Sequence, residues 1–234
     1  MSRSEHPVSE LWKGRRPVTR KQVASAALLA ITGYLGNALA LHLGYNVDFL
    51  LGSIFSLMAV RLLGIRLGVA VALIAACQTW LAWNHPYAVI ILTAEAVWVG
   101  VALRSGRRNL LLLDACYWLV VGMPLVFLYY GGVMRVGLSA TMLMALKQGV
   151  NGVANALLAT LLLNHILPRR WLPEAEAGPP PYADMVFTLA AACMMLPALA
   201  LMLIRFRGPG RPVSDSAALR AGRAFTRDPG TDRA

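Results

Sequence analysis

Charged residues are scarce in this sequence of 234 residues. Only 14% are Asp, Glu, Lys or Arg, while 58% are hydrophobic. Soluble domains carry about a quarter charged and about half apolar residues, so the composition argues against a soluble fold. The few charges gather between long apolar runs, which is the arrangement of membrane-spanning helices and their loops.

Cysteine is also rare, and the signatures of common enzymes are missing. Cys77, Cys116 and Cys193 lie in apolar runs without a CxxC spacing, so we expect neither a disulfide framework nor a zinc site. His85 and His165 have no partners at metal-ligand spacing. HExxH, GxSxG, a P-loop and paired intramembrane aspartates are absent. The sequence therefore predicts no catalytic residue, no metal, no cofactor and no enzymatic activity.

The net charge of +11 does not indicate nucleic-acid binding. The basic residues stand in short clusters beside apolar runs, where membrane topology and anionic headgroups account for them. We expect the lipid bilayer as the partner, and no nucleic acid.

Seven apolar segments predict an all-α, polytopic transmembrane helical bundle, because runs of about 20 residues must be helical in lipid. A six-helix bundle (23–166) is followed by a Pro-rich cytoplasmic linker (167–182) and a seventh helix. We expect a basic cytoplasmic N-terminus over 1–22, an uncleaved first helix, and a disordered basic tail over 205–234. The segments are 23–43, 48–64, 67–83, 87–103, 110–130, 139–166 and 183–204.

The distribution of basic residues predicts a cytoplasmic N-terminus. With that orientation the inner segments carry many Lys and Arg residues, while the first three outer loops carry only Arg135. The tail after Arg205 is the exception, since seven spans would place its arginines outside. Either one segment is not a full span, the short 48–64 being the most doubtful, or the tail begins a translocated region. The inner basic residues are Arg3, Lys13, Arg15, Arg16, Arg20, Lys21, Arg61, Arg66, Arg104, Arg107, Arg108, Arg169 and Arg170.

Polar residues inside the spans outline a candidate pocket that opens to the outside. Glu95 and Lys147 are each eight residues from the outer ends of their segments, about 12 Å deep, which predicts an ion pair. Asp114 is predicted to be an ordinary inner-edge residue near Arg107 and Arg108. The predicted pocket residues are Asn37, Asp48, Gln78, Glu95, Lys147, Asn151 and Asn155, with Tyr34, Trp80 and Trp83 as walls.

A structural explanation of the same residues stays open. Asn and Gln in spans often only join helices, each contributing about 1 kcal/mol or less. Small residues such as Gly33, Gly149 and Gly152 are expected at close helix contacts rather than at hinges.

Several stretches together resemble the multi-span N-terminal sensor region of bacterial sensor histidine kinases and GGDEF-type diguanylate cyclases. They are GYLGNALALHLGYNVDFLLGSIFSLMAVRLLG (33–64), QTWLAWNHPYAVIILTAEAVWVG (78–100), NLLLLDACYWLVVGMPLVFLYY (109–130) and LKQGVNGVANALLATLL (146–162). The resemblance covers about residues 30–205 and implies a bacterial inner-membrane protein of a two-component or cyclase signalling system. Relatives continue into kinase or cyclase domains, whose motifs this chain lacks.

The resemblance implies a sensory input module without an output domain, either sensor-only or truncated. It would respond to an unknown small ligand and act through a homodimer or a separate kinase or cyclase. The alternative is a small-solute transport component with an outward-facing pocket, an analogy at the level of fold. A third hypothesis is a scaffold whose polar residues merely hold helices together.

Overall fold

A computed structural model of the protein describes residues 18–39, 41–42, 48–166 and 182–207. The predictions for the N-terminal segment 1–17, for nearly all of the linker and for the tail from 208 lie outside these residues. The chain forms two compact units, residues 1–195 and 196–234, so helix α8 (Tyr182–Arg207) belongs to both. Only residues 196–207 of the second unit are described, as the end of α8.

The described part of the first unit is all-helical apart from one short strand pair. Its elements are α1 (Arg20–Ala38), β1 (Leu41–His42), β2 (Asp48–Phe49), α2 (Gly52–Leu63), α3 (Ile65–Trp83), α4 (Tyr87–Arg104), α5 (Leu110–Tyr117), η2 (Trp118–Gly122), α6 (Met123–Val126), η3 (Phe127–Val133), α7 (Leu138–Leu161) and η4 (Leu162–Ile166). The η segments are π-helical, and they continue their neighbouring α-helices without a break. β1 and β2 pair antiparallel, with Leu41 opposite Phe49.

Within the described ranges, four helices are long and apolar enough to cross a membrane, which indicates a membrane protein. They are Ile65–Trp83, Tyr87–Arg104, Leu110–Val133 and Leu138–Ile166. Each coincides with a predicted span. The six-plus-one arrangement as a whole stays a prediction.

The predicted span 48–64 contains a much shorter helix. Its first residues form the strand β2, and α2 has 12 residues. At 1.5 Å per residue, α2 is about 18 Å long, well below the ~30 Å hydrocarbon thickness of a bilayer. The structure therefore agrees with the alternative that residues 48–64 do not form a full span.

Local signals fix the ends of several helices. Thr19 caps α1 in a capping box with Gln22, and the side chain of Asn109 accepts from Leu112 N–H at the start of α5. Gly64, with φ 83°, allows the sharp turn from α2 into α3, and Asn84 ends α3 in the left-handed region.

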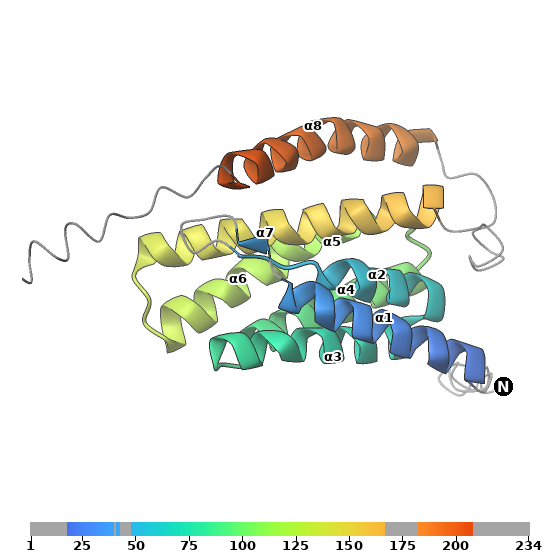
Figure 1. Ribbon diagram of the computed structural model, residues 1–234, viewed down its shortest axis with the longest axis horizontal. Helices are drawn as coiled ribbons and strands as arrows, with labels where there is room; N and C mark the ends of the chain where they lie inside the picture. Colours follow the sequence, from blue (N-terminus) through green and yellow to red (C-terminus); the bar gives the residue numbers. More distant parts are fainter. Residues whose placement is uncertain (1–17, 40, 43–47, 167–181, 208–234) are drawn as a thin grey trace, which may run out of the picture. The chain divides into compact units, whose positions relative to one another are not determined.

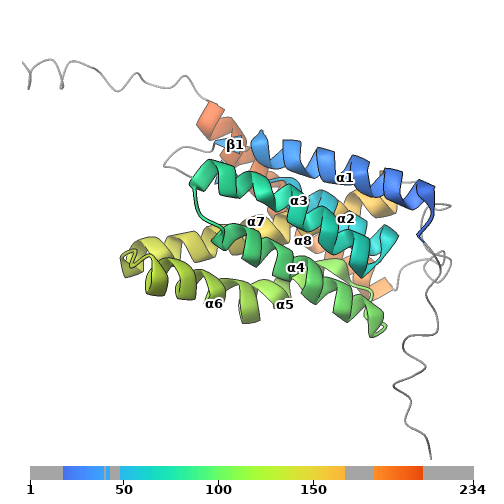
Figure 2. The same ribbon diagram turned by 90° about the horizontal axis from the view of Figure 1, so that it is seen from below.

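Helices α1 to α4 pack as successive neighbours, and α7 closes the bundle. α3 contacts α1, α2 and α4, while α7 contacts α2 and α5 (Figures 1 and 2). The seam between α1, α2 and α3 consists of small residues, Ala26, Ala30, Ala59 and Val71, which let helix backbones approach closely. A second core lies around Tyr117 and Trp118, both essentially unexposed.

Candidate functional site

The basic residues of the bundle gather at one end. Arg61 Nη1, near the end of α2, donates to the Arg108 carbonyl in the turn before α5 at 2.6 Å. Asn109 in the same turn donates to Asp184 of α8 at 2.9 Å. The α2–α3 turn, the α4–α5 turn and the start of α8 thus share one end of the bundle, which is also where Arg66 and Arg104 stand in the sequence.

Aromatic rings gather at the turn between α3 and α4, at the other end of those helices. His85 stacks on Tyr87 with a centroid distance of 5.2 Å, and Tyr87 stacks on Tyr129 of η3 at 4.8 Å. Tyr130 meets His85 edge-on at 5.3 Å. Such rings are typical of a membrane–water interface. Burial lowers the pKa of His85 below its ordinary value of 6.5.

The centre of the bundle holds Glu95, which is 1% exposed. Its Oε2 accepts a hydrogen bond from Ser53 Oγ of α2 at 2.7 Å. Its Oε1 accepts from Trp118 Nε1, the first residue of η2, at 2.9 Å. One carboxyl group thus joins α2, α4 and the long helix Leu110–Val133.

Asp114 is the second carboxyl group at this centre, and the prediction of an ordinary inner-edge residue was wrong. The side chain is 0% exposed and lies near the Glu95 carboxyl, close enough for the two groups to interact electrostatically. Neither Asp114 oxygen has a donor among the described residues. The helical period explains the difference, because Asp114 and Trp118, four residues apart, share the inward face of the helix.

Trp118 connects this centre to α7. Its indole packs directly on Gly152, where an added Cβ would overlap the Nε1 and Cε2 atoms. Gly149, one turn earlier, faces Met123, and a Cβ there would come within 2.6 Å of the Met123 Cε. Glycine is therefore required by packing at Gly152, while at Gly149 the flexible end of Met123 would have to move; both lie at close helix contacts, as the sequence predicts. Gly33 fits the same prediction, since its Cβ would lie 3.0 Å from that of Ala75.

The predicted Glu95–Lys147 ion pair is not among the contacts of Glu95 in the described chain. Trp118 places Glu95 at the level of Gly152 on α7, five residues beyond Lys147 in the sequence. That offset is about 7.5 Å along a helix axis. Lys147 itself is half-buried.

Asn37 stabilises the start of α2 instead of lining a pocket. Its Oδ1 accepts from Gly52 N–H at 2.7 Å, and its Nδ2 donates to the Ala75 carbonyl at 2.9 Å. No side chain at the N-cap position of α2 performs this function. Asn37 therefore satisfies, from α1, one of the unpaired N–H groups that every helix start exposes.

Asn155 reaches the same region from α7. Its Nδ2 donates to the Leu50 carbonyl at 2.7 Å, and both Asn155 and Asn151 are buried. Their Oδ1 atoms have no donor in the part of the chain that the structure describes. Of the predicted polar face of this helix, Asn155 is thus turned toward the segment that precedes α2.

The predicted wall residues Trp80 and Trp83 lie elsewhere. Trp80 is 52% exposed and lies on the outer surface of the bundle, and Trp83 belongs to the aromatic cluster. Tyr34 and Gln78 are half-buried. Asp48 lies opposite His42 in the strand pair. The structure therefore brings Asn37 and Asn155 to the start of α2, where Ser53 bonds to Glu95, and adds Asp114 and Trp118 around Glu95.

The sequence contained one signal for Asp114 that could have been used. A carboxylate followed four residues later by Trp, within an uninterrupted apolar run, places both on one helix face. Ser53 and Trp118 carried no comparable signal, because single Ser and Trp residues are common in spans.

Comparisons with known proteins give no family, so a function has to be argued from this geometry. No family model, no curated protein and no solved structure matches the chain.

Two carboxyl groups lie close together inside an apolar bundle. Ionising both would place like charges near each other, and a buried charge is costly.

Proposed function

We propose that the chain is a membrane-embedded input module whose state is set by the Glu95–Asp114 carboxyl pair. The observation that carries the proposal is the proximity of these two fully buried groups beside Trp118. The module would lie in the bacterial inner membrane, as a six-helix bundle with a seventh helix and a cytoplasmic N-terminus. The basic end of the bundle supports this orientation, since inner loops are enriched in Lys and Arg.

The proposed signal is a change in packing between α4, η2 and α7. Loss of the shared proton would place two negative charges together, and separation of the carboxyls would then lower the free energy. Trp118 is bonded to Glu95 and packed on Gly152, so it would move with the pair. π-helical segments are frequent at functional sites, and Trp118 begins one. A ligand or pH change that favours one protonation state would shift the population of the two packings. Output would pass through a homodimer or a separate kinase or cyclase.

Trp118 emission provides the test. The other five tryptophans are replaced by Phe, and the protein is reconstituted in lipid nanodiscs and titrated with acid and base. The proposal expects a fluorescence transition that disappears in Glu95→Gln and in Asp114→Asn. Asp184→Asn, which changes an acid at the basic end, is the matched control and should leave the transition unchanged. A transition that persists in both site variants contradicts the proposal.

Packing is tested separately by distance measurement. Spin labels on Leu112 of α5 and Leu146 of α7, both exposed, are introduced after the three cysteines are replaced. The proposal expects the label distance distribution to shift across the fluorescence transition. An unchanged distribution would mean that the carboxyl pair titrates without changing the helix packing. That result would contradict the proposed signal.

A small-solute transport component is the second candidate function. The buried Oδ1 atoms of Asn151 and Asn155 favour it, because a solute with hydrogen-bond donors would satisfy them. Flux across proteoliposomes is the deciding measurement: solute uptake that Asn155→Leu abolishes would replace the input-module proposal.

A further inference from the structure

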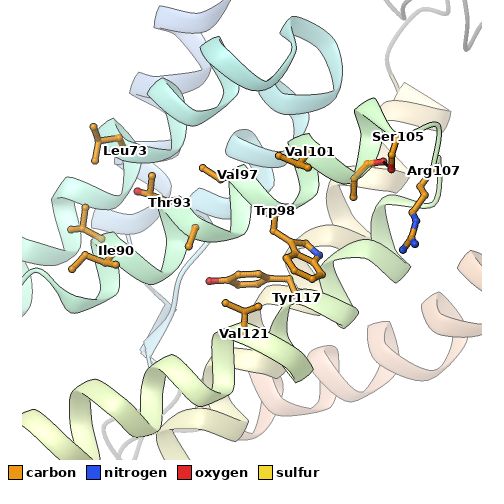
Figure 3. A pocket seen from close by; sticks show the side chains of 13 residues that line it. Leu73, Ile90, Thr93, Val97, Trp98, Val101, Ser105, Arg107, Tyr117 and Val121 are labelled. Atoms are coloured by element: carbon orange, nitrogen blue, oxygen red, sulfur yellow. Dashed lines mark hydrogen bonds between the residues drawn. The ribbon is translucent and has the colours of Figure 1, made fainter. Parts of the chain in front are cut away.

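A long apolar groove runs along α4 on the surface of the bundle. It has a volume of about 770 Å³ and lies between α3, α4 and the helix Leu110–Val133. Figure 3 shows Leu73 and Ile90 at one end and Ser105 and Arg107 at the other. From Ile90 to Ser105 the groove follows α4 for about 22 Å at 1.5 Å per residue.

The groove faces the space that lipid would occupy. Ile90, Val97 and Val101 of α4 are 43%, 40% and 56% exposed, and they lie on a helix apolar enough to span a membrane. Trp98 and Tyr117 form part of its wall, with ring centroids 6.4 Å apart. The length exceeds half of the ~30 Å hydrocarbon thickness, so one acyl chain of a single leaflet fits within it.

One end of the groove is strongly cationic. Arg107 lines it, and Arg104 and Arg108 are exposed on either side. The Arg61–Arg108 hydrogen bond brings a fourth guanidinium group to the same turn. Among the described residues, the acidic side chain at this end is Asp184, which accepts a hydrogen bond from Asn109. Arginine binds phosphate oxygens with paired N–H donors.

We infer that this groove is a binding site for an anionic phospholipid, with one acyl chain along α4 and the phosphate at Arg107. Apolar length and positive charge occur in one continuous groove, which distinguishes the site from a basic loop that only sets topology. The inference does not depend on the proposed function, because none of the groove's charged residues belongs to the Glu95–Asp114 centre.

The test is lipid retention by the purified full chain in native mass spectrometry. The protein is equilibrated with equal amounts of phosphatidylglycerol and phosphatidylcholine of identical acyl chains. We expect retained phosphatidylglycerol to exceed phosphatidylcholine, and Arg107→Gln to reduce the preference about fivefold. Val97→Trp, which fills the groove, should remove both lipids.

Arg66→Gln is the matched control, since Arg66 is an exposed arginine at the same end but outside the groove. It should leave the preference unchanged. The inference is overturned if Arg66→Gln and Arg107→Gln reduce the preference equally, or if the wild-type protein retains neither lipid after detergent exchange. Retention of both lipids by Val97→Trp would also overturn it.

Discussion

The contact between Trp118 and Gly152 offers the sharpest test of the packing. Replacing Gly152 by Ala places a methyl group where the indole ring lies. Intrinsic helix propensity alone would favour Ala by about 1 kcal/mol. Overpacking in a rigid core costs about 1–3 kcal/mol, and loss of the Trp118–Glu95 hydrogen bond costs about 1.5–3 kcal/mol. The expected net loss in unfolding free energy is about 3 kcal/mol.

The assay is reversible unfolding in mixed micelles by titration with a denaturing detergent, followed by circular dichroism. Gly131→Ala is the matched control, because a Cβ there would meet Thr141 at an ordinary 3.5 Å. It should be neutral or slightly stabilising.

A double-mutant cycle with Trp118→Phe separates packing from other effects. The smaller ring leaves room for the new methyl group, so the combined cost should fall below the sum of the two single costs by more than about 0.5 kcal/mol. Additive costs, or a Gly152→Ala variant as stable as the wild type, would refute the described contact.

Three further variants test single interactions by the same unfolding assay. Asn37→Ala should cost about 3 kcal/mol, because it leaves buried backbone groups at the start of α2 unpaired, and Asn37→Asp should recover part of the loss by restoring the acceptor for Gly52 N–H. Tyr117→Phe should cost about 1 kcal/mol, the worth of its 2.6 Å hydrogen bond to the Ile91 carbonyl, and an unchanged midpoint would contradict that bond. His85 has a folded-state pKa below its unfolded value, so its contribution to stability is complete above pH 6.5 and declines as the pH falls below it. His85→Asn should show a weaker decline than the wild type between about pH 6.5 and pH 5.

The sequence predicted the helices better than it predicted their contacts. Apolar runs located the four candidate spans, because lipid leaves the backbone no alternative to internal hydrogen bonding. Composition did not reveal that residues 48–64 begin as a strand. The residues that follow this strand, Leu50 and Gly52, are bonded to Asn155 and Asn37, which reach them from distant helices.

The site was partly predictable for the same reason. A charged or amide residue within an apolar run can be found by inspection, and this identified Glu95, Asn37, Asn151 and Asn155 as inward-facing. The residue that contacts each of these side chains could not be found by inspecting the sequence. Pairing depends on how far one helix is shifted along another, and a shift of one turn moves a side chain by about 5.4 Å.

The free energy of the Glu95–Asp114 pair indicates what kind of role it has. Two buried carboxyls contribute little to stability, and apolar or neutral replacements of buried ionisable groups are often neutral or stabilising. Asp114→Asn should therefore leave the unfolding free energy equal to or above that of the wild type, while the pH response of Trp118 is lost. Greater stability with lost response is the signature of a functional site, since activity and stability commonly oppose each other at such sites. If Asp114→Asn instead unfolds the bundle by several kcal/mol, the pair is a structural element, and the input-module proposal loses its central observation.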